Sequence, residues 1–106
     1  MKTISAEIYS ELTKLGLKNV KAFTLDEMLE LLPFTIGMCG LVVEKTITSE
    51  YVCGYFNALT VFASLSFIHK IKSKNPAEAA GKLLVWCIEN GHVKVEDLNN
   101  DNKTKN

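Results

Sequence analysis

Residues 35–68 constrain the fold most strongly, because apolar residues recur there at every second position and β-branched and aromatic residues are common. A period of two is typical of a half-buried β-strand, since successive side chains point to opposite faces. Two short connections, at residues 46–50 and 57–58, divide the segment and favour antiparallel hairpins. The sequence therefore predicts a three-stranded antiparallel meander with strands near 36–46, 50–56 and 59–68.

Two short helices are expected before the strands. Residues 4–15 carry apolar side chains three or four positions apart, and Gly16 can end this helix because glycine adopts positive φ readily. The second helix has the sequence of a capping box, in which the side chains of Thr24 and Glu27 each accept a hydrogen bond from the other residue's backbone N–H. Pro33 ends this helix after about two turns, because its ring disfavours helical geometry in the preceding residue.

A third helix is predicted over residues 76–89, with Asn75 as the N-cap and Pro76 in the first helical position. Val85 and Trp86 fall outside its main apolar stripe, so this helix is apolar around most of its circumference. Such a helix needs cover on two sides, which another part of the chain, a second copy or another protein can supply. The candidate interface residues are Trp86, Val85, Lys82 and Glu89.

These elements predict one α+β domain over residues 1–96, with the third helix packed on the sheet. The alternation "HVKVEDL" predicts a short additional strand through Val93 and Val95. Residues 97–106 are polar and poor in apolar side chains, so we expect them to form a disordered tail.

Composition narrows the environment of the chain. Lys+Arg and Asp+Glu both number 12, so the net charge is zero and gives no general attraction to nucleic acid or to an anionic membrane. The N-terminal segment lacks the apolar core of a signal peptide, and the most apolar windows are about half as long as a membrane-spanning helix. The three cysteines include no CxxC pair, which indicates reduced thiols. We expect a cytoplasmic protein without a membrane segment.

No group of residues predicts catalysis. The two histidines and Cys39, Cys53 and Cys87 lack the closely spaced ligand pairs of zinc sites, and nothing local marks a cysteine as an activated nucleophile. Capping explains the acids around Glu27, and no glycine-rich phosphate loop is present. The sequence therefore predicts a noncatalytic protein that needs no metal, cofactor or small-molecule ligand.

The basic residues Lys70, Lys72 and Lys74 alternate after the third predicted strand and would share one side if that strand continued. They could contact the phosphates of a nucleic acid. Alternatively, they discourage edge-to-edge pairing of the sheet, which is the interpretation that we favour.

Two segments, "FTLDEMLELLP" and "AEAAGKLLVWCIENG", resemble small uncharacterised proteins of phages, prophages and mobile elements of gut bacteria, which implies an accessory role. The order of strands and helix also resembles double-stranded-RNA-binding domains and small antitoxin domains. The resemblance to double-stranded-RNA-binding domains rests on Lys72, Lys74, Lys82, Ala77 and Ala80. Asn75 and Pro76 replace the usual helix start, and the glycine-proline-histidine loop of that family is missing.

From these patterns we expect a noncatalytic protein-interaction domain that forms a homodimer or binds a protein partner, with Trp86 and Val85 at the interface. A nucleic-acid-binding module is the alternative.

Overall fold

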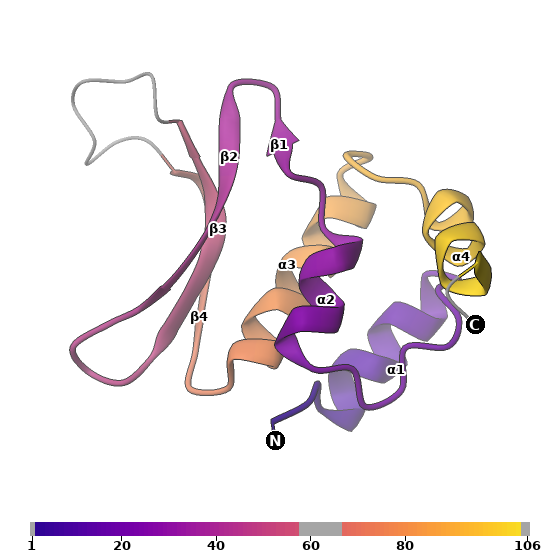
Figure 1. Cartoon of the computed structure of the whole chain (residues 1–106), viewed down its shortest axis with the longest axis horizontal. Helices are drawn as coiled ribbons and strands as arrows, with labels where there is room; N and C mark the ends of the chain where they lie inside the picture. The colour runs from indigo at the N-terminus through magenta and orange to yellow at the C-terminus, as the bar shows by residue number, and fades with distance from the viewer. Residues whose placement is uncertain (1, 58–66, 105–106) are drawn as a thin grey trace.

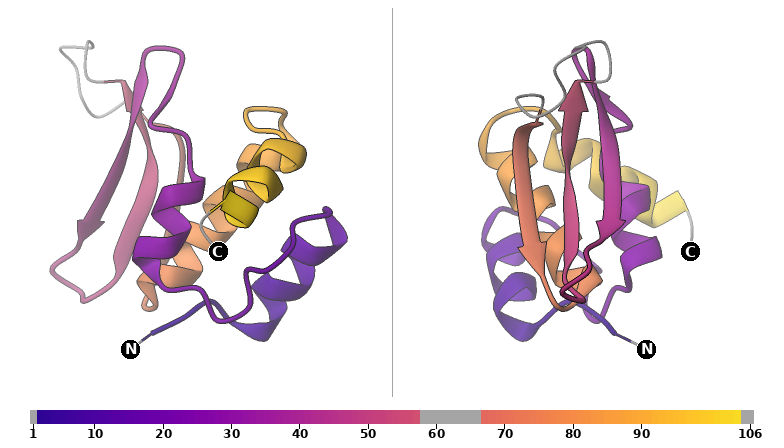
Figure 2. Two further views of the ribbon diagram at one scale, coloured as in Figure 1. Left: turned by 45° about the vertical axis from the view of Figure 1, so that its right-hand side comes forward. Right: turned by 90° about the vertical axis from the view of Figure 1, so that its left-hand side faces the viewer.

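The structure is a computed structural model that describes residues 2–57 and 67–104 (Figure 1). A sheet forms one layer, and helices pack against one of its faces (Figures 1 and 2). The α+β class is therefore confirmed. In chain order the elements are α1 (Ala6–Lys14), α2 (Leu25–Leu31), β1 (Thr35–Ile36), β2 (Cys39–Lys45), β3 (Tyr51–Asn57), β4 (Phe67–Ser73), α3 (Pro76–Glu89) and α4 (Val95–Thr104).

The sheet has four antiparallel strands in the order β1-β2-β3-β4, so the predicted number of three is wrong. The first predicted strand is divided at Gly37 and Met38, which form a tight turn between β1 and β2. Gly37 has φ +60°, the region that glycine adopts without steric cost at the first position of a two-residue hairpin loop. A turn this short leaves the alternation of apolar residues almost intact, which explains why the sequence pattern looks like one strand.

The second predicted strand is confirmed as β3, whereas the connection that follows it is not the predicted turn at residues 57–58. Phe56 pairs with Phe67, and a two-residue turn would instead have paired Phe56 with Leu59. Residues 59–66, most of the predicted third strand, lie outside the described part of the chain. The strand paired with β3 is β4, so Lys70 and Lys72 lie within a strand rather than beyond one.

The capping signals are confirmed by the geometry of α2. The backbone N–H of Thr24 donates to Oε1 of Glu27 over 3.0 Å, and the N–H of Glu27 donates to Oγ1 of Thr24 over 3.4 Å. The helix ends at Leu31, two residues before Pro33. Gly16 follows α1 with φ +101°, as expected of a glycine that ends a helix.

Helix α3 lies between the sheet and the other helices (Figure 2). It packs against β3 and β4 on one side and against α1 and α2 on the others. The buried residues of α3 include Leu83, Leu84 and Cys87. Cover by other elements of the same chain thus largely explains why α3 is apolar around most of its circumference.

The C-terminal segment differs from the prediction: Val93 lies in a bend rather than in a strand, and α4 begins at Val95 and occupies most of the expected tail. Leu98 is only 4 % exposed, so α4 contributes to the core. Asn99 fixes the helix to the loop after α1: its amide donates to the carbonyl of Gly16 over 3.0 Å and accepts from the N–H of Lys18 over 2.8 Å. Leu98 and Asn99 thus anchor α4 to the rest of the fold although its sequence is mostly polar. Two such residues do not make a periodic apolar pattern, so the sequence did not indicate this helix.

Candidate functional site

Trp86, the leading interface candidate, is partly covered by two histidines. The ring of His69, from β4, stacks on it with the centroids 4.4 Å apart and the planes at 4°. His92, from the segment after α3, lies with its centroid 4.9 Å away at a tilt of 40°. Burial lowers the pKa of His69, since the charged imidazolium would lose hydration there. The indole of Trp86 therefore makes ring contacts within the same chain to both histidines.

Of the other three interface candidates, Val85 is buried, whereas Lys82 and Glu89 are exposed and lie one helical turn from Trp86 on α3. Val85 is 8 % exposed and belongs to the core, where it lines a shallow pocket with Glu89 and with residues of α1. Trp86 contacts His69 of β4, whereas Val85 lies beside residues of α1, so these adjacent residues pack against different elements.

The cysteines are buried, as the sequence indicates. Burial raises the pKa of the Cys53 and Cys87 thiols to about 11, so both are protonated at neutral pH. The Cys87 thiol donates to the hydroxyl oxygen of Tyr55 over 3.9 Å, and that hydroxyl donates to the carbonyl of Pro33 over 2.8 Å. Burial also raises the pKa of Tyr55. The Cys87 thiol and the Tyr55 hydroxyl thus each have a hydrogen-bond partner inside the protein, as expected of buried polar groups with a structural role.

Among the residues that the structure describes, no three His, Cys, Asp or Glu side chains are placed to hold a metal ion.

The lysines occupy the face of the sheet opposite the helices. Lys70 and Lys72 are exposed at alternate positions of β4, whereas His69 and Ile71, which alternate with them, point inward and are half-buried. Lys74 is exposed beyond the end of the strand, and its carbonyl accepts from Nζ of Lys2 over 3.2 Å. The structure thus brings Lys70 and Lys72 together on one face, with Lys74 following them.

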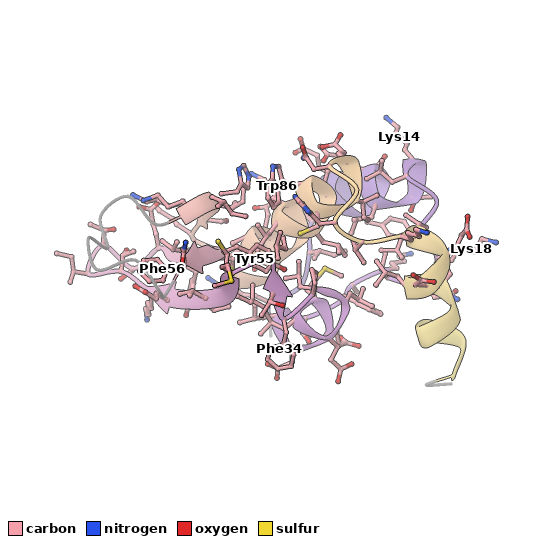
Figure 3. All side chains as sticks on the ribbon, turned by 90° about the horizontal axis from the view of Figure 1, so that it is seen from above. Lys14, Lys18, Phe34, Tyr55, Phe56 and Trp86 are labelled. Atoms are coloured by element: carbon pink, nitrogen blue, oxygen red, sulfur yellow. The ribbon has the colours of Figure 1, made fainter. Side chains whose placement is uncertain are left out.

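An apolar pocket of about 410 Å³, which the sequence did not predict, opens between α2 and the start of the sheet. Its lining residues are Leu29, Glu30, Leu32, Phe34 and Leu41. Phe34 is 89 % exposed, although a side chain of this size and polarity is usually buried. Figure 3 labels Phe34 beside α2, away from Trp86. A large aromatic residue directly after the proline that ends α2 was the available signal for this pocket. Periodicity alone, however, assigns the neighbouring leucines of α2 to the core.

Comparison of the chain with protein-family models, curated proteins and solved structures gives no match. Each helix within residues 2–57 and 67–104 is too short, or too polar, to cross a lipid bilayer.

Proposed function

We propose that this chain is a noncatalytic protein-interaction domain that receives an apolar side chain of a partner protein in the pocket beside Phe34, and that it also associates with itself. The 89 % exposure of Phe34 carries the first part. Burying a phenylalanine side chain contributes roughly 1.5–3 kcal/mol, so leaving it in water gives up that free energy. A partner that covers Phe34 and fills the pocket recovers it.

The composition of the pocket supports a protein partner over a small molecule. Of the described residues that line it, four are apolar and Glu30 is polar. Sites for small molecules usually add several convergent polar groups that fix the orientation of the ligand. An exposed aromatic residue beside an apolar pocket is instead the arrangement of a protein-binding hot spot.

A matched pair of variants tests this part. Phe34→Ser removes the aromatic ring, and Ile47→Ser makes a comparable change in the turn after β2, where Ile47 is fully exposed (104 %) and lines none of the described pockets. Each tagged protein would be recovered from its source cells after nuclease treatment. We expect a companion protein to be retained by the original chain and by Ile47→Ser and lost from Phe34→Ser. A companion retained equally by all three, or by none, contradicts the role of Phe34.

A nucleic-acid-binding function is the second candidate, and the placement of Lys70 and Lys72 on one exposed face favours it. Phosphate contacts release counterions, so binding to a duplex should be measurable at low salt and should fall steeply as salt rises. Fluorescence anisotropy with a labelled RNA duplex and a labelled DNA duplex measures this. Absence of binding at low salt would eliminate the candidate.

A further inference from the structure

Strand β2 is paired along only part of its free side. β1 pairs with the first two residues of β2, and the N–H of Leu41 donates to the carbonyl of Phe34 over 2.9 Å. β2 itself continues to Lys45. Figure 1 shows that β1 lies along one end of β2 only. Residues 42–45 therefore form an edge without a neighbouring strand, which we call the open edge of β2.

Two residues of the open edge direct their backbone groups outward. Successive residues of a strand bond alternately to the strands on either side. Because the N–H of Leu41 points toward β1, those of Val43 and Lys45 point the same way. The alternate residue Thr46 donates in the opposite direction, to the carbonyl of Glu50 over 2.7 Å. Within the described part of the chain, the backbone N–H and C=O of Val43 and Lys45 have no hydrogen-bond partner, so they offer a template for another strand.

The opposite edge of the sheet, formed by β4, is less suited to pairing. There the alternation directs the backbone groups of Lys70 and Lys72 outward, and both side chains are exposed. Lysines at an edge discourage the addition of another strand. On the open edge of β2, by contrast, Val43 is half-buried and apolar, and the ammonium group of Lys45 lies 5.8 Å from the centre of the Tyr51 ring on β3. Lys45 thus leans toward the sheet and away from the edge.

The apolar pocket lies next to the open edge. Val43 is paired with Cys53, which is fully buried, so Val43 points to the helix side of the sheet. Leu41, two residues earlier on the same side, lines the pocket together with Leu29 and Leu32 of α2. A residue of an added strand opposite Val43 would point to this side as well, about 4.8 Å from β2. An apolar side chain at that position can enter the pocket.

We propose that an extended segment of a partner protein adds to the open edge of β2 as a further strand, with an apolar side chain opposite Val43 in the pocket beside Phe34. This proposal rests on the proposed function, because the pocket is the same one, and it adds the backbone pairing that recognises the partner. The main chain of the segment supplies hydrogen bonds for Val43 and Lys45, and the pocket selects the side chain. A helix could fill the pocket but could not pair with the edge, since its own N–H and C=O groups bond within the helix.

Random peptides of about ten residues, the upper end of usual strand lengths, provide a probe of defined sequence. They would be displayed on phage, selected on the immobilised chain, sequenced and synthesised, and fluorescence anisotropy would measure their affinity. We expect the selected peptides to carry apolar residues at alternate positions. In the complex, the amides of Val43 and Lys45 should exchange with deuterated water at least about tenfold more slowly than in the free chain, as followed by NMR.

A matched pair of proline variants tests the pairing. Lys45→Pro removes an outward N–H from the open edge of β2, and Lys72→Pro makes the same change on the edge formed by β4. Proline is tolerated at such positions because its nitrogen faces away from the sheet. Lys45→Pro leaves a carbonyl of the bound peptide without its donor and should weaken binding at least about tenfold, whereas Lys72→Pro should bind within about twofold of the original chain. Phe34→Ser should weaken binding of the same peptides, since it removes one wall of the pocket.

The outcomes separate this proposal from the proposed function. A selection that yields no peptide, or peptides that bind Lys45→Pro as tightly as the original chain, would overturn strand addition and leave the recovery test with Phe34→Ser to decide the proposed function. Peptides that respond to Phe34→Ser but leave the Val43 amide exchanging fast occupy the pocket without pairing, which contradicts strand addition and supports the proposed function. If Lys45→Pro does not fold, the exchange of the Val43 amide in the original chain decides the question. Slow exchange of that amide in the chain alone at about 1 mM, but not at about 10 μM, would assign the open edge to a second copy and rule out the partner segment.

Discussion

Gly81 of α3 allows α1 to approach closely, and replacing it with alanine tests how tightly the two helices pack. A Cβ at this position would lie 2.6 Å from Cγ2 of Ile8 and 3.2 Å from Cγ2 of Ile4. Carbon atoms that are not bonded to each other normally approach to about 3.5–4.0 Å. The new methyl group would therefore overlap Ile8 by close to 1 Å, and α1 would have to move away from α3.

Two effects of opposite sign determine the size of the change. Alanine is more favourable than glycine in the middle of a helix by roughly 0.5–1 kcal/mol. Overpacking a core costs about 1–3 kcal/mol, and we place this site at the upper end because a branched side chain on a packed helix has little room to give. We expect Gly81→Ala to lower the free energy of unfolding by about 2–2.5 kcal/mol.

A double-mutant cycle isolates the contact. Ile8→Ala removes Cγ2 together with the rest of the side chain and should itself cost about 2–5 kcal/mol. In that background Gly81→Ala should be neutral or stabilising, since the helix preference remains and the overlap does not. Ile8→Val keeps Cγ2 and should leave the cost of Gly81→Ala unchanged, which makes it the matched control. Urea unfolding followed by the fluorescence of Trp86, the single tryptophan of the chain, measures all six proteins. A Gly81→Ala variant that is more stable than the original chain would refute the close approach of α1 to α3.

Three further changes test the interior and the helix caps. Because burial lowers the pKa of His69, the folded state favours the neutral imidazole. The free energy of unfolding should therefore be full above the unfolded-state pKa of about 6.5 and should fall as the pH drops through the lower folded-state pKa. His69→Gln should reduce this loss, as measured by urea unfolding at pH 7.5 and pH 5. Cys53 and Cys87, whose pKa is about 11, should react with a disulfide reagent at pH 8 roughly 100-fold more slowly in the folded protein than in urea, as timed by absorbance. Thr24→Ala removes the hydroxyl that caps α2 and should lower the free energy of unfolding by about 1 kcal/mol, whereas Thr48→Ala in the exposed turn after β2 should change it little.

Local signals in the sequence were sufficient to predict the helices whose ends are marked by side chains. Both ends of α2 are marked by residues close to it in the sequence, namely Thr24, Glu27 and Pro33. No distant contact was therefore needed to predict where this helix lies. The turn at Gly37 was missed because a single glycine in an alternating segment is equally compatible with a bulge. Helix α4 was missed because its stability comes from distant contacts, such as those of Asn99 with the loop after α1.

The candidate site was harder to predict, since it depends on which elements become neighbours. Periodicity shows that Val85 and Trp86 lie outside the main stripe of α3, but it does not show that α1 covers one and that His69 stacks on the other. Phe34 presents the converse case. Its sequence neighbours give no reason to expect a side chain that is 89 % exposed, because the pocket beside it is formed by residues from both α2 and β2.

Glu44 tests the alternative nucleic-acid function, because Glu44 and Lys72 lie in one row across the sheet with Val52 between them. Glu44→Lys adds a positive charge to the face that carries Lys70 and Lys72. If these lysines contact phosphate, Glu44→Lys should bind a duplex more tightly than the original chain, and its affinity should fall more steeply as salt rises. Lys82→Glu changes the charge of an exposed residue of α3 and should bind the duplex like the original chain. Fluorescence anisotropy at low salt measures the three proteins, and a Glu44→Lys variant that binds no better than the original chain would contradict phosphate contacts on this face.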